Sequence, residues 1–294
     1  MSNRTNMNNS SLKKVYHSLS AEKPYEVSHG FSPETREAYG GDSHYDLQIC
    51  VVLSGQMEVR YNDFSTFVSA GQFWLTSCWE PHFSRVSRKR MGYIVITVSP
   101  EFLGAVDMFR EMNWLAPFFV PPSQRPRAET VKERLAVHGI ARSIKRVWKN
   151  KPYGWKNLIW LKLHELMILA TENWKKESPS FSPNDFIRLL PAIRHVRDNP
   201  DKSLSVEEAA RLCAMSRSGF SNLFTATLGK SFAKFALNAR ISDAARKLSS
   251  TSMPIKDIAS ECGFADLGHF YRVFEKHFKS TPLSYRKRRF QELQ

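Results

Sequence analysis

Residues 254–279 read PIKDIASECGFADLGHFYRVFEKHFK, and residues 205–229 read SVEEAARLCAMSRSGFSNLFTATLG. The two segments follow the same plan, with one residue inserted in the second copy. The corresponding positions are Ala210 and Ala259, Cys213 and Cys262, Met215 and Phe264, Phe220 and Phe270, Phe224 and Phe274, and Leu228 and Phe278. An internal repeat predicts that one structural unit occurs twice.

Each copy predicts a short helix, a tight turn and a second helix. Small residues such as Ala210 and Ala259 allow the two helices to approach closely, and Gly263 can end its helix in a left-handed conformation. Ser216 and Asp266 stand where a side-chain oxygen would cap the second helix. Because the apolar residues of the second helix recur four positions apart, its other face is exposed. This is the pattern of a helix-turn-helix, whose second helix enters the major groove of DNA.

A third helix is predicted between the copies, over FAKFALNARISDAARKLSS at 232–250, where apolar residues form one stripe. About fifteen helical residues span roughly 22 Å. With helix widths and tilts added, that length can separate two recognition helices by one duplex turn, about 34 Å.

Residues 190–290 resemble the DNA-binding domain of the AraC/XylS family of bacterial transcription regulators. The resemblance is carried by IKDIASECGFADLGHFYRVFEKHF and the following TPLSYRK. It implies two helix-turn-helix units joined by a linker helix. One departure is Lys279, where the family usually has glycine; a left-handed backbone there costs about 1 kcal/mol.

Residues off the apolar stripe of each second helix are the candidate DNA contacts. In the first copy they are Arg217, Ser218, Ser221, Asn222 and Thr225, and in the second Gly268, His269, Tyr271, Arg272 and Lys276. Arg272 could bond guanine O6 and N7, and Asn222 could pair with adenine. Phosphate contacts are expected from Lys230, Lys234, Arg286, Lys287, Arg288 and Arg289. The alternative is an ordinary solvated helix face.

Composition agrees with a polyanionic partner. The 294-residue chain has a formal net charge of +15, and nucleic acid is the usual partner of so basic a protein. The excess is spread along the chain, at +7 over residues 1–180 (24 basic, 17 acidic) and +8 over 181–294 (19 and 11). Four scattered cysteines favour free thiols in a reducing cytoplasm over disulfides or structural zinc. With no long apolar run, we expect a cytoplasmic protein without a membrane partner.

The N-terminal half predicts short strands in a small barrel or sandwich, from runs such as LQICVVLSG, MEVRYNDFSTFVSAG, QFWLTS and GYIVITVS. Two stretches, HYDLQICVVLSGQMEV (44–59) and AGQFWLTSCWEPHFSRV (70–86), resemble the cupin-like sensor barrel found in the same family. A barrel of this size can hold one small ligand. Candidate ligand contacts are Tyr45, Arg60, Trp74, Trp79 and His82, with plain core packing as the alternative.

No metal, cofactor or catalytic residue is expected. His44, Asp46 and His82 could supply three ligands to a divalent ion, but local hydrogen bonding at the barrel rim is the favoured interpretation. The apolar residues of helix 156–174 run almost all round it, which suits burial on more than one side. The family resemblance favours pairing with the same helix of a second chain, that is, a homodimer.

The expected fold is α+β and multidomain. Its parts are a disordered tail (1–20), a cupin-like sensor barrel (21–110), a helical dimerisation region (111–177), a linker (178–187) and an all-α double helix-turn-helix domain (188–294). The expected function is sequence-specific binding of double-stranded DNA and effector-responsive activation of nearby genes, with RNA polymerase as a further partner. Two alternatives stay open, a metal-dependent cupin enzyme with a basic helical tail and a constitutive DNA-binding protein.

Overall fold

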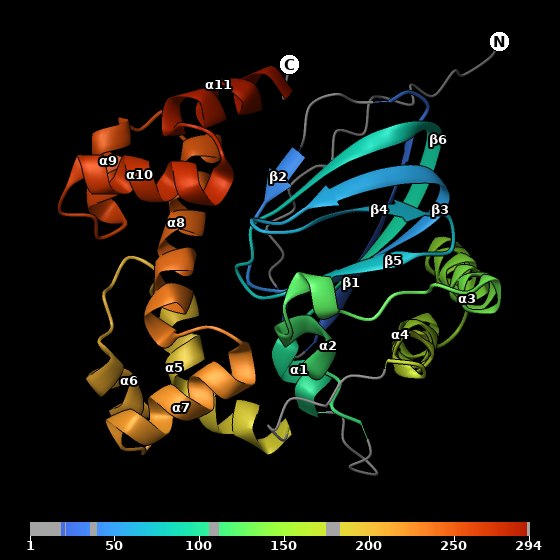
Figure 1. Ribbon diagram of the computed structural model, residues 1–294, viewed down its shortest axis with the longest axis horizontal. Helices are drawn as coiled ribbons and strands as arrows, with labels where there is room; N and C mark the ends of the chain where they lie inside the picture. The colour runs from blue at the N-terminus through green and yellow to red at the C-terminus, as the bar shows by residue number, and fades with distance from the viewer. Residues whose placement is uncertain (1–18, 21, 36–39, 106–111, 175–182, 293–294) are drawn as a thin grey trace.

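The protein is described from a computed structural model that covers residues 19–20, 22–35, 40–105, 112–174 and 183–292. An antiparallel sheet fills the N-terminal half, and the C-terminal domain is helical (Figure 1). The strands are β1 (Tyr25–Ser32), β2 (Gly40–Asp42), β3 (Leu47–Arg60), β4 (Ser65–Ser69), β5 (Phe73–Thr76) and β6 (His82–Val98). Short or hairpin-forming helices follow and lie against the sheet: α1 (Pro100–Ala105), α2 (Ala116–Phe119), α3 (Val131–Asn150) and α4 (Trp155–Thr171).

The sheet is organised around its two longest strands. The order is β1-β6-β3-β4, with β2 on β6 and β5 on β3, and every pairing is antiparallel. The runs LQICVVLSG and MEVRYNDFSTFVSAG, expected as separate strands, are not separated at Ser54 and Gly55, because β3 continues through these residues as an irregular, bulged stretch. Gly55 permits this with φ +73°, and a Cβ there would lie 2.8 Å from the Cα of Met91.

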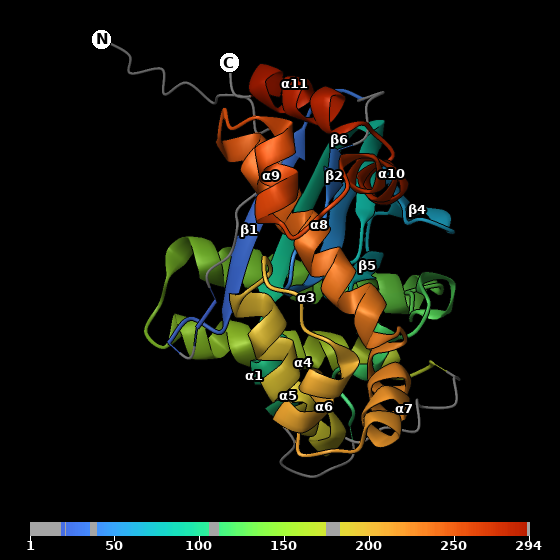
Figure 2. The same ribbon diagram turned by 90° about the vertical axis from the view of Figure 1, so that its left-hand side faces the viewer.

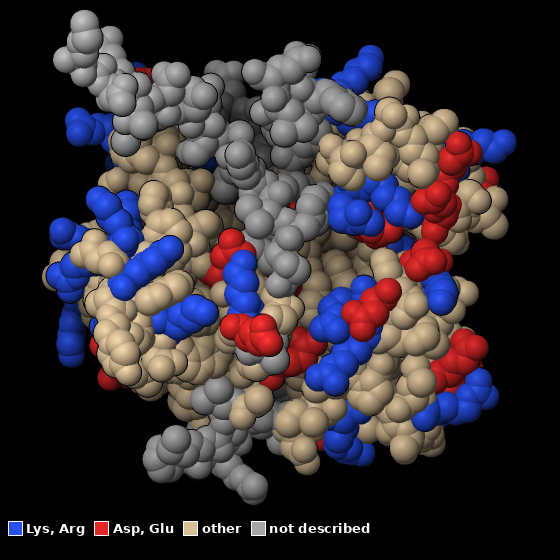
Figure 3. Space-filling view, turned by 180° about the vertical axis from the view of Figure 1, so that it is seen from behind, with Lys and Arg blue, Asp and Glu red and all other residues tan. Residues whose placement is uncertain are grey.

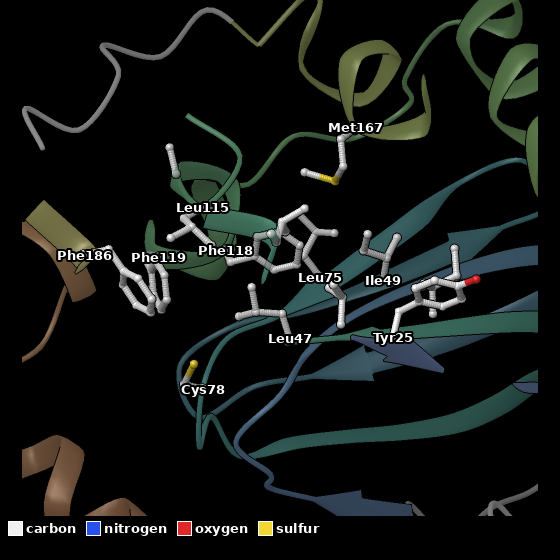
Figure 4. Packing of buried hydrophobic residues seen from close by; sticks show 14 of the residues in the cluster. Tyr25, Leu47, Ile49, Leu75, Cys78, Leu115, Phe118, Phe119, Met167 and Phe186 are labelled. Carbon is white, nitrogen blue, oxygen red and sulfur yellow. The ribbon is translucent and has the colours of Figure 1, made fainter. Parts of the chain in front are cut away.

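The sheet is apolar on both faces. Alternate residues Leu47, Ile49 and Val51 face the helices, whereas Cys50 and Val52 join a second cluster on the opposite face. Figure 4 shows the first of these faces, where residues of β3 and β5 meet side chains of α2 and α4; the labelled residues include Leu47, Ile49, Leu75, Leu115, Phe118 and Met167.

The C-terminal domain contains α5 (Pro183–Asp198), α6 (Val206–Leu212), α7 (Arg217–Leu228), α8 (Phe232–Ser250), α9 (Ile255–Glu261), α10 (Leu267–Phe278) and α11 (Pro282–Glu292). The helix predicted over 232–250 is confirmed as α8. Its first half, including Phe235, belongs to the core that continues into the sheet, and its second half, including Leu248, packs with α9 and α10. One helix therefore joins two cores.

Much of the predicted tail and of the predicted linker lies outside the described residues. Of the tail at 1–20, only 19–20 are described, and of the linker at 178–187, residues 183–187 already belong to α5. Pro183 suits the first turn of a helix, since proline lacks the N–H that would be left unbonded there. Among the described residues, no helix combines the length and hydropathy needed to cross a membrane.

Candidate nucleic-acid interface

Two helix pairs, α6 with α7 and α9 with α10, repeat the same arrangement. Buried and exposed positions alternate identically in the two second helices. Residues 221–230, from α7 to two residues beyond its end, match residues 271–280, from α10 to two residues beyond its end. Phe220 and Phe224 are fully buried, and so are Phe270 and Phe274 at the matching positions. Asn222 and Arg272 are likewise equivalent, and both are exposed.

The turns confirm the predicted caps. Ser216 Oγ accepts the Gly219 N–H at 3.2 Å. The carboxylate of Asp266 accepts two N–H groups, from Gly268 at 3.3 Å and His269 at 2.6 Å. These bonds satisfy amides that would otherwise lack a partner at the start of α7 and α10. They also lower the pKa of Asp266 below its usual value, so the cap stays ionised.

The candidate DNA contacts lie on the faces of α7 and α10 that point away from the core. All of them are exposed except Ser221 and Tyr271, which are half-buried at equivalent positions. Arg217 forms an ion pair with Glu207 at 2.8 Å, and Arg272 lies 3.6 Å from Asp266. Both arginines keep more than 70% of their side chains exposed, at 72% and 73%, so these pairs leave the guanidinium groups accessible.

Two of the residues expected to contact phosphate form hydrogen bonds within the protein. The ammonium of Lys230 donates to the Cys78 carbonyl at 3.1 Å, and Arg286 donates to the Met253 carbonyl at 2.6 Å. Both groups therefore hold parts of the protein together. Lys234 and Lys287 are exposed, as a phosphate contact requires. The side chains of Arg288 and Arg289 lie outside the described residues.

The helices α7 and α10 lie at opposite ends of α8 and on the same side of it (Figures 1 and 2). Two exposed recognition surfaces on one side of a connecting helix are what neighbouring sites on one face of a duplex require.

The sheet domain contacts both helix pairs, a feature that sequence reasoning missed. Beyond the Lys230–Cys78 bond, Asn238 of α8 donates to the Trp79 carbonyl at 3.1 Å, and the Trp79 ring packs edge-on against Phe235. The hydroxyl oxygen of Ser43 lies 2.7 Å from the hydroxyl oxygen of Ser242 in α8 and 3.2 Å from the Nε2 atom of His277 in α10. The segment after β5 and the residue after β2 thus contact α8, α10 and Lys230, which follows α7.

A polar cluster connects the sheet with α5. The carboxylate of Glu101 accepts bonds from Tyr45 at 2.9 Å and from Arg197 of α5 at 2.8 Å. Asp46 is 6% exposed beside this cluster. Burial, and then the negative charge of Glu101, raise the pKa of Asp46 to about 7 despite the opposing charge of Arg197.

The candidate ligand residues fall into separate places. Trp74 and His82 lie together, with ring centroids 5.4 Å apart, while Tyr45 and Trp79 form a pair at the boundary with the helical domain. Arg60 is exposed and pairs with Glu58 at 3.6 Å. A recess lined by Trp74, Tyr61, Phe64 and Arg125 holds only about 40 Å³, which is room for water and not for an organic effector.

The structure brings two of the three considered metal ligands together, because the rings of His44 and His82 are 5.2 Å apart. Each directs its Nδ1 atom to a carbonyl, of Asp46 and Glu80 respectively. In the described part of the chain, no group of three His, Cys, Asp or Glu side chains is arranged to hold a metal ion.

Comparison with known proteins identifies this fold. A family described as "Helix-turn-helix domain" matches residues 209–288, which include most of α6 and all of α7–α10. An uncharacterized HTH-type transcriptional regulator of Bacillus subtilis is 38% identical over 95 residues, covering 32% of this chain and 30% of that protein. The chain matches between 25% and 34% of the length of this and the next such relatives. The transcriptional activator NphR of Rhodococcus is 24% identical over 84% of this chain and 71% of its own.

Solved structures extend the likeness over both halves. ToxT from Vibrio cholerae has a TM-score of 0.58 with 14% identity, covering 90% of this chain and 98% of ToxT. A ToxT structure with an unsaturated fatty acid bound has a TM-score of 0.52 at 14% identity, covering 89% and 94%. The helix-turn-helix match covers the exposed recognition faces, the relatives are regulators, and the two-part fold is that of ToxT. Residues 209–288 are therefore a helix-turn-helix domain similar to those of known transcriptional regulators, and the chain as a whole shares the fold of ToxT.

Proposed function

We propose that the protein regulates transcription by binding specific sites on double-stranded DNA. The observation that carries this function is the repeat itself, in which two capped second helices expose equivalent faces on one side of α8. Each helix pair acts as a helix-turn-helix unit, and the two enter successive major grooves. The DNA-binding domain extends from 188 to 294, with α5 beginning slightly before it.

Within this surface, Asn222 and Arg272 read bases. They occupy equivalent exposed positions at the middle of α7 and α10, and their side chains match the acceptors and donors of adenine and guanine respectively. The neighbouring candidates, Arg217, Ser218, Thr225, His269 and Lys276, position the helices on the backbone and the groove edges.

The test begins with bound sequences selected from random duplex DNA. Arg272→Ala should weaken binding to the selected site by about 1–3 kcal/mol and relax preference at one base pair. Arg211→Ala is the matched control, since it removes the same charge from an exposed position on α6. Equal weakening on all sequences by Arg272→Ala would falsify base reading by this side chain.

The sheet domain serves as a cupin-like sensor over residues 21–110 that responds to a small molecule. The contacts of Trp79 and Ser43 with α8 and α10 support this role, because movement of either segment would change how the recognition helices are held. The fatty acid bound to ToxT supports an apolar acid as the first effector class to screen. The candidate contact residues remain Tyr45, Arg60, Trp74, Trp79 and His82.

Thermal unfolding across a metabolite panel tests the sensor. A ligand at 100 times its dissociation constant adds about 2.7 kcal/mol to the stability of the folded state. A stabilising compound should also change affinity for the selected DNA site. Stabilisation without any change in DNA affinity would favour the constitutive alternative, in which the sheet domain does not control the helices.

A second copy of the chain is the proposed partner of α4. Leu158, Leu161 and Ile168 are exposed on one face of this helix, at 38%, 65% and 49%. Lys162 and Glu165 lie on the same face, so antiparallel pairing would set opposite charges against each other while burying the leucines. Leu161→Glu should convert a dimer to a monomer in sedimentation, whereas Tyr153→Glu, at an exposed position outside the face, should not. RNA polymerase is the further partner where the protein acts as an activator.

A further inference from the structure

The hairpin of α3 and α4 carries a concentration of positive charge, of which the proposed function uses only Lys162, in the pairing of α4. Between Glu133 and Glu165 the chain has eight lysines and arginines and no aspartate or glutamate. This stretch alone accounts for the basic excess of the N-terminal half. The eight residues are Arg134, Arg142, Lys145, Arg146, Lys149, Lys151, Lys156 and Lys162.

Half of these cations form one line along α3. Arg142, Lys145, Arg146 and Lys149 are spaced as neighbours on a single helix face, and the line is about 10 Å long. All but Lys145 are exposed. Within the described ranges, no carboxylate lies within ion-pair distance of this line, and the ion pair on the hairpin's second helix joins Lys162 to Glu165 at 3.8 Å.

The turn between the helices adds cations and aromatic rings. Lys151 and Lys156 lie 5.6 and 6.0 Å from the ring of Trp155, and Tyr153 is fully exposed between them. The positive field reaches the sheet beneath, where burial and then the charge of Lys145 lower the pKa of His29. In Figure 3 lysines and arginines are seen on both halves of the molecule, but near the left edge, on the side of the hairpin, few acidic residues lie between them.

This basic surface faces away from the recognition helices. In Figures 1 and 2 the hairpin and the pair α7 and α10 lie on opposite sides of the protein. A straight duplex held by α7 and α10 therefore cannot reach the line of cations on α3.

We propose that the α3–α4 basic surface binds the phosphate backbone of a second segment of duplex DNA, without reading its sequence. A line of unopposed lysines and arginines is the residue set that phosphate contacts use. Among the described residues between Arg142 and Lys149 no large apolar side chain is exposed, whereas a protein partner would call for an apolar centre and a membrane surface for apolar side chains that insert between lipids. The surface thus lets one protein hold its specific site and a neighbouring stretch of DNA together. This role rests on the proposed function, because the first duplex is the one that α7 and α10 bind.

The experiment measures capture of a second duplex by the full-length protein. The protein is first bound to an immobilised duplex that carries its selected site, and a labelled duplex of about 30 base pairs with unrelated sequence is then added over roughly 50 to 200 mM salt. Arg142→Gln/Arg146→Gln/Lys149→Gln should reduce capture at low salt roughly tenfold or more. The slope of log affinity against log salt should become shallower by about 0.9 for each phosphate that the variant no longer neutralises. Binding to the immobilised site should not change, and failure of that first step would count against the proposed function instead.

Two variants isolate the effect. Arg88→Gln/Lys89→Gln/Arg90→Gln removes the same charge from exposed positions in β6 and should capture DNA like the wild type. Arg142→Lys/Arg146→Lys/Lys149→Arg keeps the charge and should also capture normally. Unchanged capture by the glutamine variant, or an equal loss in the β6 control, would overturn the proposal. So would wild-type binding to phosphatidylserine vesicles that the glutamine variant loses while its DNA capture is unchanged.

Discussion

Two residues of the C-terminal domain adopt a left-handed backbone although they are not glycine. Ala214, in the turn before α7, has φ +51°, and Lys279, after α10, has φ +52°. The matching positions of the other copy are Gly263 and Gly229. Each helix pair thus carries one glycine and one strained residue. We predict that Ala214→Gly and Lys279→Gly each stabilise the protein by roughly 0.5–1 kcal/mol, measured by urea unfolding.

The glycine partner of Lys279 provides the control. A Cβ at Gly229 would lie 2.4 Å from the Phe119 carbonyl oxygen, in addition to meeting the left-handed strain. Gly229→Ala should therefore destabilise the protein by more than the reverse change at Lys279 stabilises it. If Lys279→Gly lowers the stability, the lysine side chain contributes something that outweighs its backbone strain.

At the scale of elements, the sequence predicted the helical half well and the sheet less well. Local signals were sufficient for α8 and for the caps at Ser216 and Asp266, because these depend on residues three or four positions apart. The continuation of β3 through Gly55 depends instead on its contact with Met91 in β6, which no local pattern reveals. The same limit explains why the sequence did not reveal the role of Lys230, because its hydrogen-bond partner, the Cys78 carbonyl, is distant in the chain.

The segment between β5 and β6, which contacts the helical domain, is held in place by one buried arginine. Arg125 forms paired 2.7 Å bonds with Glu80 and donates to the carbonyls of Leu75 and Phe118. Burial alone would raise the pKa of Glu80, but the adjacent guanidinium lowers it, so the pair stays charged. Removing one partner leaves a buried charge, and Arg125→Met should cost about 3–5 kcal/mol of unfolding free energy.

A double-mutant cycle separates the pair from its surroundings. Arg125→Met combined with Glu80→Gln should lose less stability than the sum of the single changes, with a coupling of about 0.5–3 kcal/mol. Arg127→Met is the control, since Arg127 lies over the Phe64 ring and not in the core. Strict additivity would mean that the arginine acts through the carbonyl groups alone.

At the scale of the whole molecule, the boundary between the two halves was not predictable. Ser43 and Ser242 are 199 positions apart in the chain, and Tyr45, between β2 and β3, contacts Glu101 of α1 and Arg197 of α5. Short polar side chains carry no signal for such pairing. Sequence resemblance therefore indicated the two parts but not the contacts through which one constrains the other.

Asp46 makes this boundary sensitive to pH. Its pKa is raised from 3.8 to about 7 in the folded protein, so between these values the folded state holds a proton that the unfolded state has released. Stability from this group is complete below about pH 4 and is lost as pH rises to about 7. Asp46→Asn mimics the protonated form at every pH. The variant should match the wild type near pH 4 and exceed it by up to roughly 4 kcal/mol above pH 7.

Urea unfolding of both proteins from pH 4 to 8 measures the difference directly. Asp63→Asn, at an exposed position in the turn after β3, removes the same charge and should show no growing advantage. Because Glu101 and Arg197 face Asp46 from α1 and α5, the gain should also appear as a tighter hold of α5 on the sheet, seen as slower amide exchange in α5 at pH 8. A constant difference between Asp46→Asn and wild type across this range would show that the carboxylate is already ionised in the folded state.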